Sequence, residues 1–125
     1  MVHKLKIQES AENYLETILM LKNKNSFVRS IDIASELSVT KPSVSIAMKA
    51  FREEGYIEVD GNGHITLTDK GMAIAEKMYD RHRVIAEFFI SLGVSEDIAY
   101  EDSCKIEHYI SEESYTKIKE YLGRD

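Results

Sequence analysis

Residues 30–54, SIDIASELSVTKPSVSIAMKAFREE, decide the fold. They contain two apolar repeats of helical period, and the step Ser38-Val39-Thr40 separates them. We expect Ser30 to cap the first helix and Thr40 the second, because a hydroxyl that accepts a backbone N–H is favoured there. Pro42 falls in the first turn of the second helix, where its missing N–H breaks no helical bond. Two short helices joined by such a turn form a helix-turn-helix.

Each of the two helices is expected to bury one face. Apolar residues recur every three or four positions in both, as on one side of an α-helix. The expected inner residues are Ile31, Ala34 and Leu37 in the first helix and Val44, Ala47, Met48 and Phe51 in the second. The second helix is expected to end near Gly55, since glycine commonly follows a helix C-terminus.

The opposite face of the second helix is polar and is the predicted DNA-reading surface. Hydroxyl, Lys and Arg side chains meet base edges and phosphates in a major groove. The free N–H groups of a helix N-terminus also favour a phosphate. The residues expected to contact DNA are Thr40, Lys41, Pro42, Ser43, Ser45, Ile46, Lys49 and Arg52. The alternative interpretation of the same residues is a solvated helix face.

The next segment changes to the alternating pattern of a β-hairpin. Residues 56–59 and 64–67 alternate in polarity, and Asp60-Gly61-Asn62-Gly63 between them is a strong turn sequence. This hairpin would be the wing of a winged helix-turn-helix. Its tip carries Asp60 and neither Lys nor Arg, so the sequence gives little support for a wing that reaches DNA phosphates.

Helical spacing returns on both sides of this core. Upstream, Tyr14, Ile18 and Leu21 form an apolar stripe that follows an expected cap at Ser10. Thr68 is expected to cap a long helix that Gly93 closes. Downstream of the hairpin, helices are predicted over residues 68–92, 95–110 and 111–123, with Ser95 and Ser111 starting the last two.

The predicted fold is mainly α with a small β-hairpin, in two domains. A winged helix-turn-helix DNA-binding domain is expected over residues 1–70, and a helical domain over residues 71–125. The chain of 125 residues has a net charge of −6, which argues against a protein that coats nucleic acid by bulk charge. Residues 1–70 contain nine Lys/Arg and ten Asp/Glu, whereas residues 71–125 contain seven and twelve. The first domain can therefore still present a basic face.

Composition also bears on the compartment. A single cysteine, Cys104, excludes an internal disulfide and indicates a reducing cytoplasm. No apolar run approaches the roughly 20 residues of a membrane span. We therefore expect a cytoplasmic protein with no membrane partner.

Three potential metal ligands lie close together in the predicted helix 95–110. Cys104, Glu107 and His108 share one face at i, i+3 and i+4. Thiolate, carboxylate and imidazole together can hold a divalent first-row transition metal. The alternative is chance placement on a polar helix face. The aliphatic stripe expected on the opposite face is Ile98, Ile106, Tyr109 and Ile110.

Two other helices can add ligands. His82 lies on an apolar stripe of helix 68–92, where a histidine is either a satisfied core residue or a ligand. Asn13 and Glu16 share a face of the first helix away from its apolar stripe and would complete the site; by itself, Glu16 would be a surface carboxylate. Five or six donors from three helices suit a five-coordinate or octahedral ion better than a closed tetrahedral zinc site.

Several motifs occur here in the order typical of one family. They are Ala11-Glu-Asn-Tyr-Leu-Glu-Thr-Ile, Thr40-Lys-Pro-Ser-Val-Ser, Leu67-Thr-Asp-Lys-Gly, Arg81-His-Arg and, as the most specific, Glu101-Asp-Ser-Cys-Lys-Ile-Glu-His-Tyr-Ile-Ser. The chain resembles the diphtheria toxin repressor family from about residue 10 to 122. The resemblance implies an iron- or manganese-dependent homodimer that binds operator DNA and represses metal-uptake or related genes. In length the chain is similar to the manganese transport regulators.

The resemblance also implies ligand roles. Cys104, Glu107 and His108 match the family's metal-binding segment in its dimerisation domain. His82 matches a ligand histidine on the long helix, and Glu16 matches a first-helix carboxylate ligand of the manganese branch.

At four positions the sequence departs from one or both branches of the family. Asn13 stands where the manganese branch has Asp and the iron branch Met. Ala86 stands where the iron branch has a Glu ligand, and Tyr100 where it has a histidine. Cys104 has the residue of the iron branch, where the manganese branch has Glu. A soft thiolate favours Fe²⁺ over the oxygen-preferring Mn²⁺, so we expect Fe²⁺ ahead of Mn²⁺.

The sequence therefore predicts a metal-dependent DNA-binding transcriptional regulator, a homodimeric repressor that dimerises through residues 71–125. The alternative is a winged-helix regulator that answers a redox or organic signal through Cys104 without metal. An enzyme is not expected, because the chain has neither a Gly-rich phosphate loop nor a nucleophile–base pair.

Overall fold

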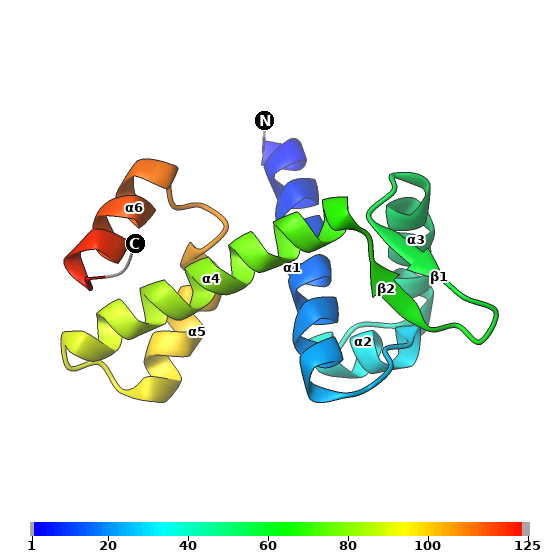
Figure 1. Ribbon diagram of the computed structural model, residues 1–125, viewed down its shortest axis with the longest axis horizontal. Helices are drawn as coiled ribbons and strands as arrows, with labels where there is room; N and C mark the ends of the chain where they lie inside the picture. The colour runs from blue at the N-terminus through cyan, green and yellow to red at the C-terminus, as the bar shows by residue number, and fades with distance from the viewer. Residues whose placement is uncertain (1, 124–125) are drawn as a thin grey trace. The chain divides into compact units, whose positions relative to one another are not determined.

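The computed structural model describes residues 2–123, with side chains from residue 10 onward. The fold is mainly α with one antiparallel hairpin, as predicted (Figure 1). In chain order the elements are α1 (Val2–Lys24), α2 (Ser30–Leu37), α3 (Lys41–Glu53), β1 (Ile57–Val59), β2 (Ile65–Leu67), α4 (Asp69–Ser91), α5 (Glu96–Ile106) and α6 (Glu112–Tyr121). They form two compact units, Met1–Glu76 and Lys77–Asp125.

The helix-turn-helix consists of α2 and α3. Ser38 ends α2 in the left-handed conformation, with φ 54°, and its N–H bonds back to the carbonyls of α2. Thr40 is the N-cap of α3, and its hydroxyl accepts the backbone N–H of Ser43 at 3.3 Å. Pro42 lies in the first turn of that helix. The predicted turn and cap of α3 are confirmed.

The start of α2 differs from the prediction by one residue. Arg29, not Ser30, is the N-cap, and Ser30 is the first helical residue. The Asp32 carboxylate accepts the backbone N–H of Arg29 at 2.9 Å. A carboxylate in the first turn therefore satisfies the N–H that helices leave free at this end.

The inner face of α2 is also different from the one predicted. Ile33 and Ala34 are buried, whereas Ile31 is 54% exposed. Residues two apart lie on nearly opposite sides of a helix at 100° per residue. Ile31 and Ile33 therefore cannot both face the core, and the structure buries Ile33.

The core of the first unit brings α1 against α3 and the hairpin. Its fully buried side chains include Leu15, Ile18, Val44, Ile57 and Ile65. Helix α1 begins at Val2, so Ser10 lies inside this helix and does not cap it. No Gly or Pro precedes Ser10, so nothing in the sequence ends the helix before Val2 is reached.

The hairpin has the register that its alternation predicts, with Ile57 opposite Leu67 and Val59 opposite Ile65. Helix α4 follows the hairpin after a single residue, Thr68. At Gly71 a Cβ would overlap the backbone carbonyl oxygen of Tyr56. Only glycine therefore lets α4 pack this closely against the hairpin.

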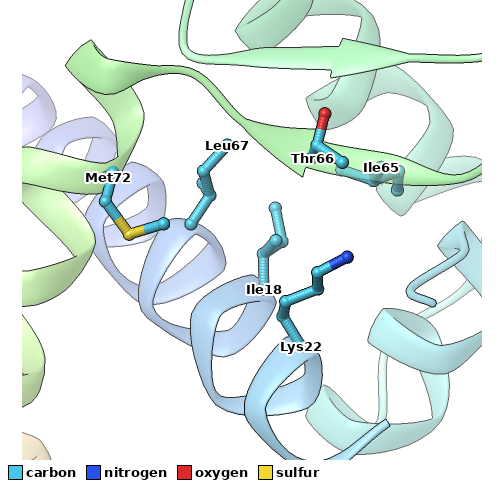
Figure 2. A pocket seen from close by; sticks show the side chains of 6 residues that line it. All are labelled: Ile18, Lys22, Ile65, Thr66, Leu67 and Met72. Carbon is cyan, nitrogen blue, oxygen red and sulfur yellow. The ribbon is translucent and has the colours of Figure 1, made fainter. Parts of the chain in front are cut away.

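A small pocket of about 120 Å³ lies between α1 and β2 in the first unit (Figure 2). Its lining is apolar apart from two polar side chains. The lining residues are Ile18, Lys22, Ile65, Thr66, Leu67 and Met72. The Lys22 ammonium already donates to the carbonyl of Ser26 at 3.1 Å, so the polar groups that would orient a ligand do not converge in this pocket.

In the second unit, α5 and α6 join the C-terminal part of α4. Helix α4 ends at Ser91, and Gly93 follows with φ 101°. The Ser111 hydroxyl accepts the N–H of Ser114 as N-cap of α6, as predicted. Helix α5 ends at Ile106 rather than at residue 110, and Glu107 is its C-cap. The chain therefore turns before the α6 cap.

The buried face of α5 is not the predicted aliphatic stripe. Ala99, Ser103 and Glu107 are fully buried, whereas Ile98 is 49% and Tyr109 60% exposed. Small side chains at 99 and 103 allow close approach to α4, where the Ser103 hydroxyl donates to the carbonyl of His82 at 2.5 Å. Ile98 and Tyr109 consequently remain outside, whereas Ile106 and Ile110 are half-buried.

Among the described residues, no helix is both long and apolar enough to cross a membrane.

Candidate metal centre and DNA-facing helix

His82, Cys104 and Glu107 bring three different metal-binding groups together in the second unit. His82 comes from α4, Cys104 from the last turn of α5, and Glu107 from the residue after it. One ligand atom of each lies within 4.8 Å of the other two. The predicted grouping of these three residues is therefore present in the structure.

Glu107 is at the middle of this arrangement and is fully buried. Its Oε2 lies 2.9 Å from Nδ1 of His82, and its Oε1 lies 3.5 Å from Nε2 of His108. A carboxylate away from water needs hydrogen-bond donors or positive charge. An imidazole nitrogen that carries a proton can donate a hydrogen bond to the carboxylate. A divalent cation can supply positive charge in place of that proton.

Neighbouring groups orient His82. Besides its bond to the His82 carbonyl, the Ser103 hydroxyl lies 3.4 Å from His82 Nδ1. The Tyr100 ring lies beside the imidazole, with centroids 5.4 Å apart. Such surrounding contacts fix the orientation of a ligand imidazole.

The donors fit a divalent first-row transition metal. Metal–ligand bonds of about 2.0–2.3 Å separate neighbouring ligand atoms by roughly 3–4 Å. The 2.9 Å between His82 Nδ1 and Glu107 Oε2 lies just below that range. The exposed Cys104 thiol adds a soft donor at the surface of the cluster.

His108 reaches this region by a different geometry from the one predicted. The helical spacing of Cys104, Glu107 and His108 assumed a helix that continues to residue 110, but residues 107–109 form a turn. The turn still keeps the His108 side chain only 4% exposed and next to Glu107. Proximity to the carboxylate was therefore predicted correctly, but the continuation of the helix from Ile106 to residue 110 was not.

Asn13 and Glu16 lie on α1 of the first unit. Glu16 is buried at 4% exposure, so it is not the surface carboxylate that its sequence position alone suggested. Asn13 is half-buried, and its backbone carbonyl accepts the Thr17 hydroxyl at 2.8 Å. As metal ligands both remain predictions.

The two departures from the iron branch have simple structural consequences. Ala86 is fully buried in α4 and offers no donor atom. Tyr100 lies against the His82 ring. A second metal site of the iron-branch kind thus lacks two of its ligands at these positions.

The eight residues predicted to contact DNA are all exposed. Val44, Met48 and Phe51 hold the opposite face of α3 in the core, so the helix presents its polar side outward. The Thr40 and Ser43 hydroxyls lie 2.8 Å apart at its N-terminus. Exposure is necessary for contact with DNA but equally fits a solvated face, so the contacts remain predictions. The exposed residues are Thr40, Lys41, Pro42, Ser43, Ser45, Ile46, Lys49 and Arg52.

Sequence reasoning missed a cation at the hairpin tip. Arg29 precedes α2, yet its Nε donates to the carbonyl of Asn62 at 3.2 Å and its Nη2 lies 3.0 Å from Nε2 of His64. The exposed Phe27 ring stacks on His64 at 4.2 Å. The tip therefore gains a positive charge from a residue more than thirty positions away, which no local pattern signals.

Two family models match the chain. The model described as iron dependent repressor, N-terminal DNA binding domain, covers residues 6–65. The model described as iron dependent repressor, metal binding and dimerisation domain, covers residues 68–124.

Full-length relatives are similar over most of the chain. An uncharacterized HTH-type transcriptional regulator of Methanocaldococcus jannaschii is 33% identical over 120 residues, covering 94% of this chain and 96% of the relative. The transcriptional regulator MntR of Escherichia coli is 33% identical over 107 residues, covering 86% of this chain and 69% of the relative.

Solved structures share the fold. A manganese-dependent transcriptional repressor in complex with manganese superposes with a TM-score of 0.84 at 26% identity over 92% of this chain. T. acidophilum IdeR superposes with a TM-score of 0.80 at 28% identity over 91%. The chain spans only about half of the length of these two structures, 53% and 54%.

Proposed function

Because the chain belongs to the iron-dependent repressor family, we propose that it is a metal-activated transcriptional repressor that binds operator DNA as a homodimer. The single observation that carries this proposal is the convergence of His82, Cys104 and Glu107 within 4.8 Å. In this function the divalent metal supplies positive charge and a fixed geometry to the residues around it.

We propose six ligand candidates for the metal. His82, Cys104 and Glu107 form the group that the second unit assembles, and the adjacent His108 is the fourth. Glu16, buried on α1, and Asn13 are the candidates from the first unit. The mechanism is linkage. Metal that binds the DNA-competent state more tightly than the other states raises the affinity for DNA, and DNA raises the affinity for metal by the same factor.

We propose Fe²⁺ ahead of Mn²⁺ as the physiological ion. The thiol of Cys104 supports this order, since sulfur suits iron better than the harder manganese. Manganese is second because relatives such as the manganese-dependent repressor respond to that ion.

The functional division is proposed to follow the sequence, with DNA binding in residues 1–70 and metal binding and dimerisation in residues 71–125. The second unit exposes large apolar side chains, and together these would suit a surface that another protein covers. A second copy of this chain is the proposed partner. The exposed apolar residues are Ile90, Leu92, Ile98, Tyr100, Tyr109 and Tyr121.

The DNA-facing surface is proposed to be the exposed side of α3, with Arg29 as an additional phosphate contact at the hairpin tip. Arg29 is exposed and held by two contacts to the hairpin, so little side-chain freedom would be lost on binding.

A Co²⁺ titration of the reduced, metal-free protein tests the metal centre. We expect a saturable sulfur-to-metal charge-transfer band that disappears in Cys104→Ala. Glu107→Gln should weaken Co²⁺ binding by at least about tenfold. Glu101→Gln is the control, because Glu101 is an exposed α5 residue paired only loosely with Lys105 at 3.9 Å.

DNA binding is tested with an operator selected from random duplexes by the metal-loaded protein. Metal should raise affinity for this operator in the wild type and in Glu101→Gln, but not in Glu107→Gln. Equal binding with and without metal, or an unimpaired Glu107→Gln, would contradict the proposal.

A further inference from the structure

Arg81, the residue before His82, is a buried cation that the proposed metal chemistry does not use. It is 5% exposed. Its Nη1 donates to the backbone carbonyls of Glu107 at 3.2 Å and Ile110 at 3.0 Å. These two carbonyls lie at the two ends of the turn that follows α5.

The adjacent residues Arg81 and His82 hold Glu107 from two sides. Arg81 binds its main-chain carbonyl, and His82 contacts its carboxylate at 2.9 Å. A carboxylate fixed through both backbone and side chain has little freedom to leave the cluster. Protein contacts alone therefore hold Glu107 through both its backbone and its carboxylate.

The rest of the guanidinium is held by α6. Nη2 donates to the Glu112 carboxylate at 2.7 Å, and the Tyr115 ring centroid lies 5.3 Å from the guanidinium carbon. Among the described residues, Nε is buried without a hydrogen-bond partner. Burying this N–H without a partner is unfavourable. The side chain nevertheless keeps the conformation in which Nη1 donates to both turn carbonyls.

We propose that Arg81 is a positioning residue of the metal centre: its guanidinium fixes the 107–110 turn and so preorganises Glu107 and His108 for the ion. This inference rests on the proposed metal function. It goes beyond that function because a residue that donates no ligand atom would set the metal affinity and the positions of the ligands. Arginine is suited to this task because its rigid fork can serve several acceptors at once.

The test compares Arg81→Met with two controls. Glu112→Gln weakens the ion pair with Arg81 but keeps both turn carbonyl bonds. Met78→Ala opens a cavity in α4, where Met78 is 1% exposed, and so lowers stability without touching the turn. Each variant is titrated with Co²⁺, and its absorption spectrum and thermal midpoint are recorded.

Arg81→Met should bind Co²⁺ about 10- to 100-fold more weakly, the range typical of residues that orient ligands. Its ligand-field bands should also shift, because the carboxylate is held differently. The Co²⁺ affinity of Glu112→Gln should stay within about threefold of wild type, because the carboxylate that it removes is exposed and its ion pair with Arg81 is therefore weak. Met78→Ala should keep the wild-type spectrum.

Hydrogen exchange of the metal-free protein provides a readout that does not depend on metal. Amides 107–111 should exchange faster in Arg81→Met than in the wild type. In Glu112→Gln they should exchange at the wild-type rate. If the wild type takes up no Co²⁺, the proposed function fails, whereas this exchange result still decides whether Arg81 holds the turn.

Wild-type affinity and spectrum in Arg81→Met would overturn the proposal, as would an equal loss in Met78→Ala. If Arg81→Met does not fold, Arg81→Lys replaces it, because an ammonium lacks the planar fork. Wild-type affinity, spectrum and amide protection in Arg81→Lys would then overturn the proposal.

Discussion

Glu107 shows how far the site can be predicted at the scale of residues. Sequence spacing singled it out together with Cys104 and His108, and the apolar stripe of α4 singled out His82. The complete burial of the carboxylate was not predictable, because it depends on a small Ser103 side chain and on the contact of two helices. Local spacing finds potential ligands, whereas their environment is a tertiary property.

Asp60 at the hairpin tip gives a pH-dependent prediction. The backbone N–H of His64, with that of Asn62, lowers the pKa of this carboxyl below its usual value of 3.8. A lowered pKa in the folded state means that the charge stabilises the fold above the unfolded-state pKa. This contribution is lost as pH falls through the folded-state value.

Asp60→Asn should therefore lower the thermal midpoint near neutral pH, where the charge is present. The difference from the wild type should shrink as the pH is lowered below about 4. Because Asp60 is exposed, we expect a small effect. A midpoint difference that is constant with pH would show that the charge does not contribute.

Ile46 gives a prediction about operator sequence. It is 72% exposed on the proposed DNA face, and an aliphatic side chain there can contact the C5-methyl group of thymine. Replacing thymine by uracil throughout the operator should weaken wild-type binding by about fourfold per lost methyl contact. Ile46→Ala should abolish this sensitivity, and equal sensitivity in Ile46→Ala would assign the methyl contact elsewhere.

At the scale of elements, the caps at Thr40 and Ser111 and the hairpin turn were predicted correctly, whereas the caps expected at Ser10 and Ser30 were not. Thr40, Ser111 and the Asp60–Gly63 turn act locally, so their positions follow from the sequence. The buried side of α2 was not decided by sequence, because Ile31 and Ile33 are equally apolar. The turn that follows α5 contacts a residue that is distant in sequence, since Arg81 donates to the carbonyl of Ile110 from 29 positions away.

Gly71 gives a prediction about the junction of hairpin and helix. Gly71→Ala should destabilise the protein by about 1–3 kcal/mol, because the new Cβ would overlap the backbone of Tyr56. This steric cost should exceed the roughly 1 kcal/mol by which alanine favours a helix. Chemical denaturation measures the difference.

Ala73→Gly on the exposed side of the same helix is the matched control. It should lose only the helix-propensity term of about 1 kcal/mol. If Gly71→Ala were more stable than the wild type, helix propensity would outweigh the contact with Tyr56.

At the scale of the whole molecule, net charge separates the two halves. Residues 71–125 carry most of the net negative charge, which is unfavourable beside DNA and acceptable in a dimerisation surface. Sequence reasoning placed Ile98 of α5 inside. Its exposure became evident only in the structure, and this exposed side chain is one that a second copy would cover.

Ile98→Glu should therefore disrupt the dimer, because it places a charge in the proposed apolar interface. Sedimentation equilibrium should show a dimer dissociation constant at least about tenfold higher. Ile31→Glu is the control, since Ile31 is similarly exposed, at 54% compared with 49%, but lies in the first unit. Equal dissociation in both variants, or in neither, would place the interface elsewhere.

Cys104 is the one thiol of the chain, and it is exposed. A maleimide or iodoacetamide would therefore label a single position, and that position is next to His82 and Glu107. An ion that takes the sulfur as a ligand competes directly with alkylation. The labelling rate of Cys104 thus reports the occupancy of the metal site. Mass spectrometry can measure this rate in a crude extract, before any chelator or column has disturbed the bound metal.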